Sequence, residues 1–266
     1  MNPAENPRKS VRIIAAIAKN TFRESIRDRI LYNLVVFALL ITASAVLLGE
    51  LTNGQQARTI VNLGTNAILL FGTFIAIFVG VGLVAKEIEK RTVYSIFAKP
   101  VGRWEFVTGK YIGLCLTLLV NTVVMAIGVC LALLYVNGTE LIVPAISAIV
   151  LIYFELLITT AIAILFSSFS TPTLAALFTL LIFIIGHLSS SLRDLGAALG
   201  TLFVGLLLEF LYYVLPNLAV FSFRTEAANG FLPPVSVIFG AAAYAIIYAC
   251  AILIIAIAIF SRRNFK

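Results

Sequence analysis

Six apolar stretches, each close to the length that a helix needs to cross a lipid bilayer, dominate this chain of 266 residues. A transmembrane helix takes about 20 consecutive, mostly apolar residues. Hydrophobic residues make up 61% of the chain and charged residues 12%, whereas soluble domains are about 45–50% apolar and about 25% charged. We therefore predict an all-α polytopic membrane protein with six transmembrane helices. The expected spans are 31–49, 63–85, 111–136, 144–166, 172–189 and 235–260.

The placement of positive charge predicts the orientation of these spans. Lys and Arg are enriched in the segments of membrane proteins that stay in the cytoplasm. Seven lie before residue 30, six lie from Lys86 to Lys110, and three follow residue 261. The remaining three, expected outside, are Arg58, Arg193 and Arg224. We expect a multi-pass protein of the inner (plasma) membrane with both termini in the cytoplasm.

The segment 191–234, between the last two expected spans, lies outside in this topology. It contains the short apolar stretch 201–215, which carries Glu209. A seventh crossing there would move the basic C-terminal end outside, so we expect a helix that lies in the outer interface or dips into the membrane and returns. We expect the segment to gate or cap an exit.

An amphipathic helix is expected within residues 1–30, before the first span. An apolar face and an opposite basic face follow from the three-to-four residue spacing, which is typical of a helix lying on the inner leaflet. The apolar face comprises Val11, Ile14, Ala18, Phe22 and Ile26, and the basic face comprises Arg12, Lys19, Arg23 and Arg27. The net charge of +7 is explained by cytoplasmic segments that face anionic lipid, and we expect no nucleic-acid partner.

The stretch AKPVGRWEFVTGKYIG (98–113) contains Gly109-Lys110 but does not match a phosphate-binding loop. Such a loop needs a Gly five positions before its Gly-Lys pair and Ser or Thr after it, whereas this chain has Trp104 and Tyr111 there. Pro100 is expected to end the helix that continues the second span, and Gly102 to let the chain turn.

A compact cytoplasmic protrusion is therefore expected between two helices. It would display four side chains: Arg103, Trp104, Glu105 and Phe106. Trp and Arg often anchor protein–protein contacts, but a lone Trp also occurs in the aromatic belt of a membrane interface. The residues alone leave both interpretations open.

The run KEIEKRTVYSIFAKPVGRWEFVTGKYIG (86–113) resembles the first cytoplasmic loop of type-2 ATP-binding-cassette (ABC) transporter permeases. In that family an acidic residue and a Thr precede a KPV-x-R-x-x-aromatic-x-x-GK turn. The matching positions are Glu87 and Glu89, Thr92, Lys99-Pro100-Val101, Arg103, Phe106 and Gly109-Lys110. The family usually has Gly before the Thr, where this chain has Arg91. The basic N-terminal helix, the outer LPNLAVFSF segment and the basic C-terminal end are also similar.

The resemblance implies a non-catalytic permease subunit of an exporter, whose loop 86–110 couples it to a separate ATPase subunit. ATP and magnesium would be bound by that subunit, and this chain would carry no cofactor. A second permease subunit, identical or related, would complete a dimer in the lipid bilayer. The residues expected to couple to the ATPase are Glu87, Glu89, Thr92, Pro100, Arg103, Trp104 and Phe106.

Glu155 lies near the middle of the fourth expected span, where ionisable residues are usually functional or paired. Asn121 and Thr122, in the third span, are candidate partners. His187, the single histidine, falls at the outer end of the fifth span and is expected to be interfacial. Glu155 also supports a proton-coupled secondary transporter as an alternative.

Two other functions are considered. A membrane anchor would recruit a cytosolic partner through the loop 86–110 without moving a substrate. An intramembrane enzyme would need a nucleophile–base pair or a set of metal ligands, and the sequence offers one His and no clustered carboxylates. We therefore expect no catalytic or metal site.

Overall fold

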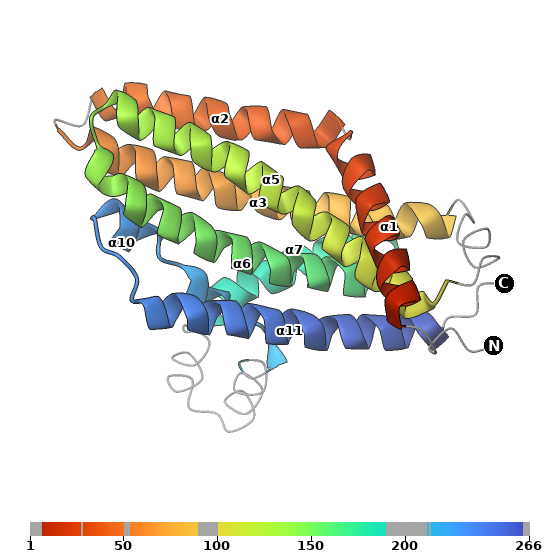
Figure 1. Cartoon of the computed structure of the whole chain (residues 1–266). Helices are drawn as coiled ribbons and strands as arrows, with labels where there is room; N and C mark the ends of the chain where they lie inside the picture. The colour runs from red at the N-terminus through yellow and green to blue at the C-terminus, as the bar shows by residue number, and fades with distance from the viewer. Residues whose placement is uncertain are drawn as a thin grey trace.

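The chain forms helices that lie side by side in a computed structural model, which describes residues 7–27, 29–50, 54–89, 101–189, 212 and 214–262 (Figure 1). No strand occurs among these residues. The α-helices are α1 (Pro7–Ile26), α2 (Arg29–Glu50), α3 (Gln56–Glu89), α5 (Arg103–Tyr135), α6 (Ile142–Ser167), α7 (Pro172–His187), α10 (Arg224–Ala228) and α11 (Val235–Arg262). Two 3₁₀ turns, η2 (Thr139–Leu141) and η3 (Leu218–Phe221), complete the described elements.

Four segments are long and apolar enough to cross a membrane: Gln56–Gly82, Arg103–Tyr135, Thr139–Ser167 and Val235–Arg262. The apolar parts of α2 (Leu34–Gly49) and of α7 are shorter. With 16 residues, α7 is about 24 Å long, less than the roughly 30 Å hydrocarbon core. The all-α membrane fold is thus confirmed, and the crossing of α2 and α7 stays a prediction.

Local sequence explains where several helices begin and end. Asn137 has φ 57°, the left-handed conformation that commonly follows a helix end, and the next N–H, of Gly138, donates to the carbonyl of Leu133 at 2.9 Å. Pro172 occupies the first turn of α7, where its missing N–H costs no hydrogen bond. The turn between the end of α6 at Ser167 and the start of α7 at Pro172 is short.

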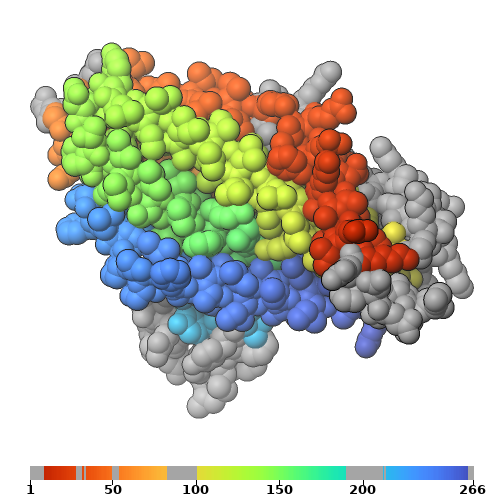
Figure 2. Space-filling model, in the orientation of Figure 1, coloured from red at the N-terminus to blue at the C-terminus, as the bar shows by residue number. Residues whose placement is uncertain are grey.

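The core of the bundle is built around α3, which packs against α2, α5, α6 and α7. Small residues let the neighbouring helices approach closely; a Cβ at Gly72 would lie 2.7 Å from Leu156 Cδ1 of α6. Of the four long candidate spans, α3 is the most buried and α11 the least. The last span thus lies at the edge of the bundle (Figures 1 and 2).

The two ends of the bundle differ. The helix α1 crosses the start of α5 at the end where α11 finishes, while the α5–α6 turn and α10 lie at the opposite end (Figure 1). This arrangement agrees with the prediction that the N-terminal helix and the end of the last span share one side. We call the α1 end cytoplasmic and the α10 end outer, following the charge placement.

Candidate functional site

The cytoplasmic turn is described from residue 101 onward. Its expected residues Thr92 and Pro100 lie outside the described residues, as do the side chains of Glu87 and Glu89. The helical run expected after the turn is present as α5, which starts at Arg103. Its first turn is capped, since the N–H of Gly102 donates to Oε2 of Glu105 at 2.7 Å.

The turn displays fewer side chains than the sequence suggested. Trp104 is 44% exposed, but Glu105 and Phe106 are 0% and 2% exposed. The expectation that Glu105 and Phe106 are displayed on the surface is therefore wrong. The reason is that the first turn of α5 is covered by neighbouring helices.

Arg103 and Phe106 both contact the end of α11. Arg103 Nη1 donates hydrogen bonds to the carbonyl oxygens of Phe260, at 3.3 Å, and of Ser261. These carbonyls belong to the last turn of a helix, where a positive charge is favourable. The ring of Phe106 stacks on that of Phe260 with 5.8 Å between centroids, and both rings are buried. The start of α5 is thus joined to the end of the last span.

Gly109 and Gly113 place α5 directly against α1. A Cβ at Gly113 would lie 2.6 Å from the carbonyl oxygen of Ala18, and one at Gly109 would lie 2.7 Å from Cβ of Ile17. The Gly-x-x-x-Gly spacing places both glycines on one face of α5, where the missing side chains permit this close approach.

Lys110 of α5 is buried and also contacts α1. Its side chain is 2% exposed, its Nζ lies 3.8 Å from Oε2 of Glu24 in α1, and it stands 5.7 Å from the centre of the Phe106 ring. The positions of the R-x-x-F-x-x-GK pattern are spaced by three or four residues. They form one stripe of α5 that contacts α11 and α1, which explains the pattern physically.

A second polar group lies inside the bundle, around Glu155 of α6. The side chain of Glu155 is 1% exposed. The residue lies about 20 Å and 18 Å, measured along the helix axis, from the two ends of α6. Oε1 of Glu155 lies 3.1 Å from Nε2 of His187, the last residue of α7. Because α7 is short, its end lies at the depth of Glu155 rather than at the outer surface. His187 was expected to be interfacial, and its buried contact corrects that expectation.

One hydrogen bond restricts where a proton of His187 lies. Nδ1 lies 3.1 Å from the carbonyl oxygen of Phe183, which can only accept, so Nδ1 carries a hydrogen. Nε2 of His187 and Oε1 of Glu155 lie 3.1 Å apart, but neither atom makes a hydrogen bond to a described residue. The two titratable side chains are thus close together inside the bundle.

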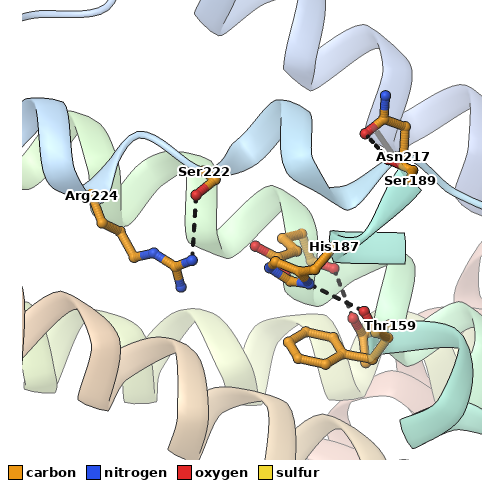
Figure 3. Close-up of polar contacts among 8 residues, drawn as sticks. Thr159, His187, Ser189, Asn217, Ser222 and Arg224 are labelled. Carbon is orange, nitrogen blue, oxygen red and sulfur yellow. Dashed lines mark hydrogen bonds and ion pairs between the residues drawn. The ribbon is translucent and has the colours of Figure 1, made fainter. Parts of the chain in front are cut away.

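Arg224 of α10 extends toward this pair from the outer segment and interacts electrostatically with Glu155 (Figure 3). Its guanidinium also lies 3.4 Å from Oγ of Ser222. The Glu155 partners expected from the sequence, Asn121 and Thr122, are buried in α5, but the structure instead brings His187 and Arg224 to this carboxylate. The outer segment thus enters the bundle far enough to contribute a charge.

Comparison with known proteins identifies the family. The family model of the ABC-2 family transporter proteins matches residues 15–265, nearly the whole chain. The chain belongs to this family. No curated protein matches the chain.

As an ABC-2 family transporter protein, the chain is a multi-pass membrane permease of an ABC transporter. The resemblance noted in the cytoplasmic loop is therefore confirmed. Such a permease is a non-catalytic transport component that works, in general terms, with an ATP-binding subunit.

A groove of about 300 Å³ lies between α3 and α7 of this ABC-2 protein. It is mainly apolar, but Asn66 is exposed in it and the buried hydroxyl of Thr73 makes no hydrogen bond to a described residue. The lining residues are Asn66, Leu69, Leu70, Thr73, Phe74, Leu180 and Phe183. Polar groups on this face favour a covering of protein or substrate over bare lipid.

Two contacts of the ABC-2 protein were not predicted from its sequence. The contact between Arg103 and α11 uses backbone carbonyls as acceptors, which leave no mark in a sequence. The contact between Glu155 and His187 could have been predicted, since an acidic residue and the only histidine of the chain both fall in expected spans. Ionisable groups in a membrane usually pair with one another.

Proposed function

We propose that this permease subunit exports its substrate with energy from a separate ATPase subunit that binds the cytoplasmic turn before α5. One observation carries the proposal: Trp104 is exposed at the very start of a helix whose neighbouring side chains are fixed in the protein. A large aromatic side chain on a rigid support is the residue type that dominates protein–protein contacts. ATP and magnesium would be bound on the ATPase.

The residues of the turn divide into two roles in this proposal. Trp104 contacts the ATPase directly, while Arg103 and Phe106 hold the turn in place through α11. Glu87, Glu89, Thr92 and Pro100 remain proposed contributors to the same coupling surface, with the two carboxylates pairing to basic residues of the ATPase. Rigid helices on both sides of the turn suit a rigid-body movement between subunits.

A second permease subunit, identical or related, is part of the proposal. The groove between α3 and α7 supports it, because the exposed side chain of Asn66 would otherwise place a polar group against lipid. Two subunits facing each other there would enclose a path between them. The substrate would leave on the outer side, which follows from the resemblance of the loop to exporters.

The test of the proposal is co-purification from native membranes in mild detergent. The wild-type chain should bring down an ATPase that contains a phosphate-binding loop, and Trp104→Ala should weaken that association by about 2 kcal/mol or more, roughly thirtyfold. Phe239→Ala, which removes another exposed aromatic ring from the outer end of α11, is the matched control and should bind normally. Size-exclusion profiles of both variants should match the wild type.

Two results would contradict the proposal. Recovery of the chain without an ATPase, even after cross-linking, would remove the energy source. An ATPase that binds but hydrolyses ATP at the same rate with and without the permease would identify a membrane anchor instead.

A proton-coupled secondary transporter is the second candidate, because the titratable side chains of Glu155 and His187 lie 3.1 Å apart inside the bundle. Such a transporter would move substrate in vesicles with a pH gradient and no ATP, and Glu155→Gln would abolish that movement. Full transport by Glu155→Gln would eliminate this candidate.

A further inference from the structure

The last span, α11, is attached to the cytoplasmic turn at its inner end. The hydrogen bonds from Arg103 to the carbonyls of Phe260 and Ser261, and the stacking of Phe106 on Phe260, join the first turn of α5 to the last turn of α11. Both aromatic rings are buried. A movement of the turn before α5 therefore acts on α11 directly.

The same helix is attached to the outer segment further along. The hydroxyl of Tyr248 donates to the carbonyl of Val214 at 3.0 Å, and the hydroxyl of Tyr244 accepts from the N–H of Asn217 at 2.9 Å. Phe221 of η3 packs against the Tyr244 ring, with 6.1 Å between centroids. Residues 214–221 of the outer segment are thus bound to one side of α11, whereas α10 packs against α3 and α6.

This attachment point also meets α7. Oγ of Ser189 donates to Oδ1 of Asn217 at 2.7 Å (Figure 3), and a Cβ at Gly186 would lie 2.8 Å from the carbonyl of Pro216. The stretch from Pro216 to Phe221 therefore lies where α6, α7 and α11 converge. A shift of α11 would displace this stretch relative to the end of α7.

Between its two attachments, α11 contacts α6 and α5, and its buried residues there are Ala249, Leu253 and Ala256. Ile252 and Ile257 are partly buried against the same core. Within the described residues, hydrogen bonds that involve a side chain join α11 to other elements at Tyr244, at Tyr248 and at the last turn of the helix. Ala249 and Ala256 project little into the grooves of a facing helix, so these two positions oppose sliding or rotation less than large side chains would.

We propose that α11 is a rod that carries movement of the cytoplasmic turn to the outer segment, with Arg103 and Tyr248 as the positioning residues at its two attachments. The helix has 28 residues and no proline after its start, and about 18 Å of it separates Tyr248 from Phe260. Rigid-body motion of such a helix transmits a displacement without bending. This inference rests on the proposed function, because the movement originates in the ATPase.

The experiment measures the outer segment while the ATPase binds nucleotide. Spin labels are placed at Val220→Cys in η3 and at Tyr135→Cys at the outer end of α5, both exposed, in a chain whose three native cysteines are replaced by Ala. The distance between the labels is measured in the permease–ATPase complex in lipid nanodiscs, with and without trapped ATP. The wild-type complex should show a nucleotide-dependent change in distance.

Tyr248→Phe removes one of the contacts between α11 and the outer segment and should reduce this change while ATPase binding and hydrolysis persist. Tyr153→Phe is the matched control: its hydroxyl also donates to a backbone carbonyl, that of Cys115 at 3.2 Å, but joins α6 to α5 and leaves α11 untouched. The control should keep the full distance change. Arg103→Gln should also reduce the change, and should still bind the ATPase.

The outcomes separate the rod from the proposed function. An equal distance change in wild type, Tyr248→Phe and Arg103→Gln overturns the rod and leaves the ATPase-driven permease intact. An equal reduction of the change in Tyr153→Phe also overturns it, since any lost hydrogen bond would then suffice. Loss of ATPase binding in Arg103→Gln overturns the positioning role of that residue. Absence of both a bound ATPase and a response in wild type overturns the proposed function together with the rod.

Discussion

A carboxyl group inside a membrane bundle is stable only when neighbouring groups compensate it, and Glu155 has two basic neighbours. His187 lies 3.1 Å away, and Arg224 interacts with it electrostatically from the outer segment. Breaking a buried pair by removing one partner leaves the other without compensation, which costs more than the pair itself contributes. The contact between Glu155 and His187 also joins α6 to α7. Glu155 is therefore expected to stabilise this junction whether or not it moves protons.

Replacing Glu155 tests this role. Glu155→Leu should lower the free energy of unfolding by about 3–5 kcal/mol, because His187 and Arg224 lose their compensating partner. Glu155→Gln should cost less, since its amide can still hydrogen-bond to Nε2 of His187. The measurement is denaturant unfolding in mixed micelles, followed by circular dichroism. Glu140→Gln, an exposed site in η2, is the control and should change little; equal stability of all three variants would contradict the prediction.

Sequence alone identified Glu155 as a special residue but proposed the wrong neighbours for it. Position in a span follows from counting apolar residues, and this counting placed Glu155 near mid-span correctly. Which residues of other helices meet it depends on where each helix ends. The α7 helix ends early, which brings His187 to the depth of Glu155, and a return of the outer segment supplies Arg224. Neither effect produces a periodic pattern of residues in the sequence.

Among the elements, the pairing of α1 with α5 shows that only part of a predicted apolar face is used for a protein contact. The predicted basic residues are exposed, as expected, and Val11 of the predicted apolar face is 64% exposed. The buried residues of α1 are small or polar (Ser10, Ala18, Thr21 and Ser25), and of these Ala18 and Thr21 lie against Gly113 of α5. The three-to-four spacing predicted the helix, but it could not assign small residues to a protein contact, since they carry little hydrophobic signal. Contact of the apolar stripe with the inner leaflet stays a prediction.

Close packing of α1 on α5 makes Gly113 sensitive to the smallest substitution. A Cβ there would lie 2.6 Å from the carbonyl oxygen of Ala18, which is backbone and cannot rotate away, so Gly113→Ala should destabilise the pairing by about 1–3 kcal/mol. The expected result is faster hydrogen exchange of the α1 amides. The control is Gly240→Ala in α11, where no atom lies within 4 Å of the added Cβ and the substitution should stabilise the helix by about 0.5–1 kcal/mol. Unchanged exchange in Gly113→Ala would show that α1 is held elsewhere.

For the whole molecule, apolar run lengths predicted the long helices well because the bilayer thickness fixes how many residues a span needs. The expected runs 111–136 and 144–166 lie within or close to α5 and α6. What run length could not predict is that α7 falls short of the bilayer and that η3 packs beside its end. That packing depends on contacts between segments far apart in the chain, such as Pro216 with Gly186.

The six-span topology makes a prediction about which turns face which side. In a chain without its native cysteines, single cysteines at Lys9 and Ser170 should react with a membrane-impermeant maleimide in inside-out vesicles. Those at Asn137 and Phe231 should react in right-side-out vesicles. All four residues lie in or beside turns or at the start of α1, and labelling after detergent solubilisation controls for burial. The decisive pair is Ser170 and Phe231: labelling from opposite sides means that α7 and the outer segment together cross the membrane. Labelling of both from the same side would show that α7 does not cross, and would place the end of α11 on the side opposite to α1.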